Sequence, residues 1–273
     1  MKTVKLYMFS GSNAVLTAQL MLAHKGIAYK RVNLPPAAHA LIMLGLGFET
    51  MAVPGLKVDG RRVQGTRYIA RFLDELVPER PLFPADPERR RAVEEAERWG
   101  EGFQNSVRRI FYCMGRRDPK AYKNVMLAER SFPMRALLSI AAPLIIRLAT
   151  AKHDAIDAAA EVDVAEMPAR LDQIDAWIAE GLLNGPDLNA ADFQIAANLA
   201  AMLLSEDAAP FVLGRPAEAL ARRVAPDYTG SVGTALPDGM IPKALPAEWL
   251  TPLRLSDGEQ PALAARRPAH AAR

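Results

Sequence analysis

The hydrophobic periodicity of this chain changes at a proline-rich segment, and the change divides the sequence into two parts of different fold class. Four prolines fall within residues 78–87, and proline at this density is typical of a linker because it fixes φ and removes an amide donor. Before the segment, strand and helix patterns alternate; after it, apolar residues recur at helical spacing. We expect a domain at 1–78, a linker at 79–87, an all-helical domain at 88–226 and an extended tail at 227–273.

The first part opens with the pattern of a strand, a helix and a second strand. Val4, Leu6 and Met8 alternate with other residues, which predicts a strand with one face on a core. Apolar residues then recur at helical spacing over 15–23, and 29–34 reads as another strand. Strands separated by one helix are predicted to be parallel, so the opening is a β-α-β unit.

A hairpin and a helix complete this part. The dipeptide Asp59-Gly60 lies between two short strand-like runs, 56–58 and 62–64, and it accommodates the positive φ angles of a tight turn. An apolar stripe follows over 69–76. The predicted order is strand, helix, strand, hairpin, helix, which is an α/β arrangement, while 35–51 has no pattern that we could assign.

Beyond the linker the predicted elements are helices. Three apolar stripes mark them, over 93–114, 167–178 and 193–204. The stretch 137–149 is the most apolar of the chain, but Pro143 and Arg147 interrupt it and it is shorter than the ~20 residues that cross a bilayer. We therefore expect a buried helix there, and no membrane partner.

Composition narrows the classes of function. The one cysteine, Cys113, excludes a disulfide within the chain and multi-cysteine metal sites, and we expect it to be buried. The histidines have no metal-ligand spacing, so no metal is expected. The formal charge of +3 at pH 7 gives no reason to expect a nucleic-acid partner. The first residues lack the apolar core of a signal peptide, so we expect a cytoplasmic protein.

Three segments carry a resemblance to the glutathione transferase superfamily. They are the strand and loop at 6–13 with Lys25-Gly26-Ile27, the segment 53–56 with Asp59-Gly60 and the helix after it, and the segment 183–193. The resemblance implies a thioredoxin-like amino-terminal domain followed by a helical-bundle domain. It also implies a cytoplasmic homodimer with a detoxification function, in which glutathione or another low-molecular-weight thiol is the cosubstrate and a small electrophile is the partner.

The same resemblance points to a hydroxyl in the loop after the first strand. Counting back from Lys25, Ser12 matches the serine of serine-type members, Ser10 lies one gap away, and Tyr7 would serve in a tyrosine-type register. A hydroxyl that donates to sulfur favours the thiolate, which is the nucleophile. We therefore name Ser12 and Ser10 as candidate catalytic residues, with Asn13 beside them as cofactor-binding. The alternative is that the serines only cap the following helix.

The remaining cofactor-binding candidates lie around the hairpin. Pro54 resembles the cis-proline of thioredoxin-like folds, whose preceding residue, here Val53, pairs with the peptide part of glutathione like an added strand. Members of the family carry an acidic residue and a serine or threonine where this chain has Gly65-Thr66, with Gln64 as a neutral substitute. Because the acid is missing, three alternatives stay open: the chain binds glutathione, another low-molecular-weight thiol, or no thiol at all.

Two further groups have competing interpretations. Phe103, Phe111 and Tyr112 are candidates for the electrophile pocket that the family has between its domains, but at helical spacing such residues are more often plain core. Asn189 and Asp192 have the spacing of a capping box, which supports the fold and not the chemistry. The sequence predicts an enzyme that activates a thiol for attack on an electrophile; the alternative is a non-catalytic binding or regulatory protein with the same fold.

Overall fold

A four-stranded mixed sheet forms the centre of the amino-terminal domain in the computed structural model, which describes residues 3–35, 38–119, 132–237 and 240. The strands are β1 (Val4–Met8), β2 (Lys30–Asn33), β3 (Gly55–Val58) and β4 (Arg61–Gln64). Their order is β2-β1-β3-β4, with β1 and β2 parallel and the other pairs antiparallel. This is the predicted thioredoxin-like arrangement. The turn residues Asp59 and Gly60 both have positive φ, at 47° and 95°, as the hairpin requires.

Helices cover both faces of this sheet. They are α1 (Asn13–His24), α2 (His39–Gly45) and α3 (Thr66–Leu76). Leu6 and Met8 pack into the core that α1 and α3 share, while Tyr7 is buried on the opposite face and its ring meets Phe48 edge-on at 5.3 Å. The prediction of one buried face was therefore incomplete, because α2 and the residues after it cover the second face. Gly55 permits this contact, since a Cβ there would lie 2.5 Å from Met43.

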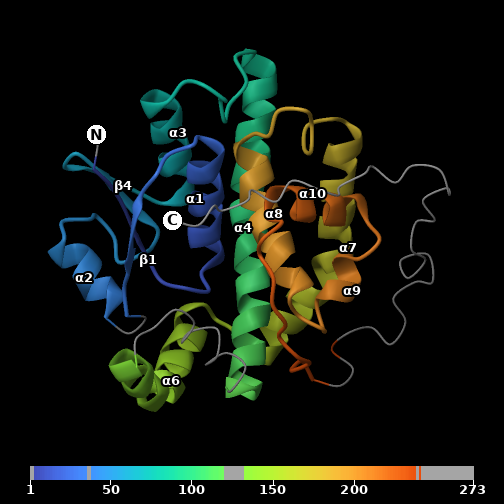
Figure 1. Cartoon of the computed structure of the whole chain (residues 1–273). Helices are drawn as coiled ribbons and strands as arrows, with labels where there is room; N and C mark the ends of the chain where they lie inside the picture. The colour runs from blue at the N-terminus through green and yellow to red at the C-terminus, as the bar shows by residue number, and fades with distance from the viewer. Residues whose placement is uncertain (1–2, 36–37, 120–131, 238–239, 241–273) are drawn as a thin grey trace, which may run out of the picture.

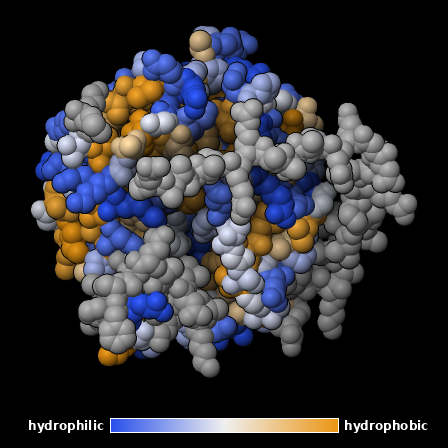
Figure 2. Space-filling model, in the orientation of Figure 1, coloured by the Kyte–Doolittle hydropathy of each residue, from blue (hydrophilic) through white to orange (hydrophobic). Residues whose placement is uncertain are grey.

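The described elements after the sheet domain are helices, of which α8 and, to a smaller extent, α4 pack against α1 (Figure 1). The helices are α4 (Pro87–Arg117), α6 (Phe132–Lys152), α7 (Asp157–Ala179), α8 (Ala190–Leu203), α9 (Ala209–Val212) and α10 (Pro216–Val224). The long α4 and α8, which is buried along its whole length except for Leu203, lie side by side in the middle. The predicted capping box is present at the start of α8, where Asn189 and Asp192 satisfy each other's backbone amides. Hydrophobic and hydrophilic residues are interspersed on the face drawn in Figure 2.

The expectation of a buried helix around 137–149 was wrong for one face of α6. Leu138, Ala142 and Ile145 are buried, whereas Ile140 is 82% exposed and Leu144 is 60% exposed. The helix continues through Pro143 and packs along one side only. Among the residues that the structure describes, no helix is long and apolar enough to cross a bilayer.

The segment between the two parts is anchored by an ion pair between a buried lysine and a partly buried aspartate. Lys25 Nζ lies 2.6 Å from the Asp74 carboxylate and donates to the Val77 carbonyl at 2.8 Å. The same carboxylate accepts the amide of Leu82, and the Leu82 carbonyl accepts the amide of Ala190 at 2.8 Å. The Lys25-Gly26-Ile27 segment thus holds the linker against the start of α8.

The chain after α10 lies along the helical domain. Val232 donates its amide to the Leu204 carbonyl at 2.6 Å, and the buried carboxylate of Asp207 accepts the amides of Ala235 and Leu236 at 2.6 and 2.9 Å. The predicted tail therefore begins as a segment bound to the loop after α8. Its part at 241–273 lies outside the described residues.

Candidate functional site

The predicted site residues converge because of the strand register. Tyr7 of β1 pairs with Gly55 of β3, and Gly55 pairs with Gln64 of β4. The carboxyl end of β1, the turn before β3 and the end of β4 therefore meet at one end of the sheet. The loop before α1 and the start of α3 leave the sheet at this end.

The two serines of the loop between β1 and α1 differ in the hydrogen bonding of their hydroxyl groups. Ser12 occupies the N-cap position of α1 in an extended conformation, at φ −89° and ψ 119°, yet its side chain makes no capping hydrogen bond. The hydroxyl of Ser10 accepts a hydrogen bond from Asn33 Nδ2 at 3.0 Å. The helix-cap interpretation of Ser12 therefore lacks its hydrogen bond, and the Ser10 hydroxyl is engaged by the end of β2.

Asn13 ties this loop to the helical domain. Its Nδ2 donates to Asn198 Oδ1 of α8 at 3.0 Å, and Asn198 Nδ2 in turn donates to the Gln194 carbonyl at 2.8 Å. Asn198 is completely buried. The first residue of α1 is thus fixed by a polar contact across the domain interface.

The turn before β3 has the predicted geometry. The Val53-Pro54 peptide bond is cis, and the Pro54 carbonyl accepts the amide of Gly65 at 3.1 Å. Within the described part of the chain, the backbone amide and carbonyl of Val53 form no hydrogen bond. Both groups are therefore available to an extended peptide lying along this end of the sheet.

Gln64 braces the loop that leads to this turn. Its Nε2 donates to the carbonyls of Thr50 and Ala52 at 2.8 and 2.6 Å, and its Oε1 accepts the amide of Thr50 at 2.9 Å. Both amide hydrogens are therefore used by the chain. Gln64 thus holds the residues just before Val53, and its contact with a cofactor stays a prediction.

The start of α3 provides a second helix N-terminus at the same end of the sheet. Gly65 is its N-cap at φ 87°, a conformation that favours glycine, and the buried Thr66 is its first residue. Neither α1 nor α3 has an acidic residue in its first turn or a side-chain cap. The positive ends of two helices therefore face a region that favours an anion, such as a thiolate or a carboxylate.

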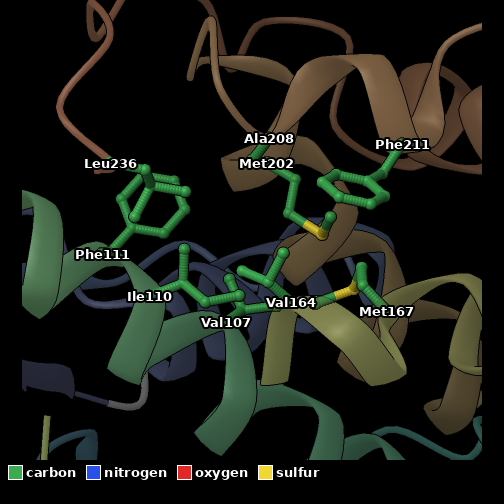
Figure 3. Close-up of a pocket in the computed structure, with 9 residues that line it drawn as sticks. All are labelled: Val107, Ile110, Phe111, Val164, Met167, Met202, Ala208, Phe211 and Leu236. Carbon is green, nitrogen blue, oxygen red and sulfur yellow. The ribbon is translucent and has the colours of Figure 1, made fainter. Parts of the chain in front are cut away.

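The three aromatic candidates for the electrophile pocket are in separate places. Phe103 is fully buried and stacks on Trp99 at 5.6 Å, so it is core. Phe111 lines an apolar cavity of about 10 Å³ inside the helical domain, closed by Leu236 among others (Figure 3). That volume holds about one water molecule, which makes the cavity a packing defect and not a substrate pocket. Tyr112 stacks on His153 at 5.1 Å.

The remaining candidate groups are structural. Cys113 is buried, and its Sγ donates to Asp157 Oδ1 at 3.1 Å. Burial raises the pKa of its thiol, and the hydrogen bond to Asp157 raises it further. No group of three or more His, Cys, Asp or Glu side chains among the described residues could hold a metal ion.

Two site residues were missed in the sequence. Asn33 holds the Ser10 hydroxyl and Asn198 holds Asn13. Asn198 could have been found from the sequence, because it is a polar residue in the middle of the alanine-rich helix that the sequence predicts to be central. Nothing in the sequence marks Asn33, since an asparagine at the end of a strand is common.

Comparison with known proteins supports the fold assignment. Residues 6–81 match the family model described as glutathione S-transferase, N-terminal domain. FzlA from C. crescentus superposes with a TM-score of 0.56 at 18% identity, over 82% of this chain and 92% of that chain. A glutathione S-transferase from Sinorhizobium meliloti gives 0.54 at 18%, over 82% and 88%. One from Methylobacterium radiotolerans, in complex with glutathione sulfonate, gives 0.52 at 20%, over 85% and 97%. Comparison with curated proteins gives no match.

Proposed function

We propose that this chain, a member of the glutathione transferase superfamily by its fold and its amino-terminal domain, binds glutathione and activates its thiol for attack on a small electrophile. The observation that carries the proposal is the cis Val53-Pro54 turn, whose free backbone groups adjoin the ends of β1 and β4. The cysteinyl part of glutathione pairs with Val53 as an added strand. Gln64 holds the loop in place, and Thr66 with the amides of α3 binds the γ-glutamyl carboxylate.

Ser12 is the proposed thiolate stabiliser. The sulfur of a peptide bound at Val53 is directed toward the end of β1, where the Ser12 hydroxyl is not used as a cap and the α1 N-terminus favours negative charge. Ser12 donates to the sulfur and lowers its pKa, while Ser10 is held by Asn33 and positions the loop. The thiol proton passes to solvent. With 1-chloro-2,4-dinitrobenzene, the sulfur–carbon bond forms, the carbon–chlorine bond breaks and chloride leaves.

A conjugation assay tests this proposal. We expect saturable turnover of glutathione with 1-chloro-2,4-dinitrobenzene, and a loss of about 10- to 100-fold in kcat/KM at pH 6.5 for Ser12→Ala, the cost of one hydrogen bond to a charged group. Ser10→Ala is the matched control and should stay within about threefold.

The pH profile separates a chemical role from a structural one. In Ser12→Ala the apparent pKa of kcat/KM should rise toward the ~8.5 of a free thiol, whereas a structural defect would leave it unchanged. Equal losses in the two serine variants would contradict the assignment. Absence of turnover with glutathione would leave the non-catalytic alternative.

A further inference from the structure

Arg108 lies on the face of α4 that is turned toward the amino-terminal domain. Glu97, on the same helix, accepts a hydrogen bond from Arg71 of α3 at 2.9 Å, which identifies this face. Arg108 follows Glu97 by 11 residues, which is three helical turns, so the two side chains leave the helix in nearly the same direction. Arg108 is half-buried there.

The register of α4 and α8 sets the level of Arg108 along the interface. Gln194 bonds to Gln104 at 2.9 Å, and the Ser205 hydroxyl lies 3.7 Å from the Met114 sulfur, so the two helices run parallel. Asn198 lies between those two contacts and is therefore level with residues 107–108. Since Asn198 bonds to Asn13, Arg108 is at the level of the loop that carries Ser12. Figure 1 shows this loop at the end of the sheet nearer α6.

Among the described residues, no carboxylate compensates the charge of Arg108. Four other arginines of α4, namely Arg90, Arg109, Arg116 and Arg117, each form an ion pair with an acid. In the described part of the chain Arg108 forms none, and its guanidinium donates only to Asn105 Oδ1, at 3.0 Å. Burial lowers the pKa of Arg108 from its ordinary value, although the group remains protonated at any physiological pH.

Two stacked aromatic rings lie close to Arg108. Tyr112, one turn further along α4, stacks on His153 from the end of α6. Burial lowers the pKa of His153 to about 4, and the positive charges of Arg108 and Lys152 contribute in the same direction. This imidazole is therefore neutral at pH 7. A half-buried guanidinium beside two stacked rings is suited to a planar anion, which it can bind through two parallel hydrogen bonds.

We propose that Arg108, positioned by Asn105, binds a carboxylate on the electrophilic substrate, so that this site prefers anionic aromatic electrophiles. The inference rests on the proposed function, because it places the electrophile between α4 and the thiolate at Ser12. Arg108 is then a specificity-determining residue, and Tyr112 and His153 flank the aromatic ring of the substrate.

The test compares 4-chloro-3,5-dinitrobenzoate with its methyl ester as electrophiles for glutathione. Because the two differ in intrinsic reactivity, each variant is compared with the wild type for each compound separately. Arg108→Gln should lose about 10- to 100-fold in kcat/KM for the benzoate, the range for a hydrogen bond to a charged group, and less than about threefold for the ester. Arg98→Gln, an exposed arginine of the same helix, removes the same charge and should leave both unchanged.

A titration without thiol separates this inference from the proposed function. 3,5-Dinitrobenzoate should bind the wild-type protein and the Arg98→Gln variant, and bind Arg108→Gln at least about tenfold more weakly. That result supports the carboxylate site even if glutathione does not react. Equal affinity in all three proteins, no binding to any of them, or equal losses for benzoate and ester in the kinetic comparison would overturn the inference.

Discussion

His153 couples the stability of the helical domain to pH. Burial lowers the pKa of this imidazole to about 4, whereas in the unfolded chain the pKa is near its ordinary value of 6.5. Between these values the unfolded state binds a proton that the folded state does not, so stability is lost as the pH falls from 6.5 toward 4. Above pH 6.5 both states are neutral and the effect vanishes.

Replacement by phenylalanine tests this coupling. His153→Phe keeps a ring against Tyr112 but removes the titration, so the free energy of unfolding of the wild type relative to the variant should fall by about 1–2 kcal/mol from pH 7 to pH 4, a figure reduced from the full shift because the group is only half-buried. Guanidinium unfolding at pH 7, 5.5 and 4 measures it. A difference that does not change with pH would show that His153 titrates normally in the folded protein.

At the same scale, the sequence alone points to the residues of the proposed site to different degrees. Ser12, Pro54 and Thr66 could be named because the family motif and the order of elements fix them near one end of the sheet. The partners of Gln64 and Asn13 could not, since they are a loop carbonyl and an amide from the other domain. Arg108 depends on the register between α4 and α8, which no local pattern specifies.

Helix starts are the elements with the clearest energetic consequence. Asn189 accepts the amides of Ala191 and Asp192 at the start of α8, and its own Nδ2 donates to the Leu182 carbonyl at 2.8 Å. Asn189 is buried, so removing its side chain would leave the two amides and the carbonyl without a hydrogen-bond partner and out of reach of water. At the exposed start of α4, Asp86 accepts only the amide of Arg89 in the same manner.

These two caps predict different costs. Asn189→Ala should lower the free energy of unfolding by about 1–2 kcal/mol or more, because the groups left behind are buried. Asp86→Ala should cost about 0.5–1 kcal/mol, since water replaces the carboxylate. Equilibrium denaturation of both variants measures the difference, and equal costs would mean that burial adds nothing to the cap of α8.

Elements with a strong local signal were predictable, and those whose signal depends on neighbours were not. Asp59-Gly60 specified the hairpin, and Asn189 with Asp192 specified the start of α8. The short α2 escaped prediction because only Met43 of its seven residues is buried, so its apolar residues do not form a stripe. For α6, composition indicated burial, yet Ile140 faces outward because the helix packs on one side.

At the scale of the whole molecule, the two parts of the fold share one hydrophobic core. Leu6 of β1 and Leu199 of α8 belong to the same buried cluster, and α1 packs extensively on α8. The linker is held by Lys25 and Asp74. With so much core in common, we expect the sheet and the helical domain to unfold together.

A mutation in the sheet tests this cooperativity. Trp99 and Trp177 lie in α4 and α7, in edge-on contact at 5.0 Å, and therefore report on the helical domain. In a Trp249→Phe background, which leaves only these two, Leu6→Ala should lower the unfolding free energy measured by tryptophan fluorescence by about 2–5 kcal/mol. Far-ultraviolet circular dichroism should give the same midpoint. A tryptophan transition unaffected by the change in β1 would show that the domains unfold independently.

Isothermal titration calorimetry with glutathione tests whether the end of the sheet at Ser12, Val53 and Thr66 binds this peptide, as we propose. We expect saturable binding at one site per chain. Affinity should weaken for Thr66→Val, which removes the hydroxyl at the start of α3, and should be unchanged for Arg98→Gln. Absence of binding at millimolar glutathione would contradict the claim.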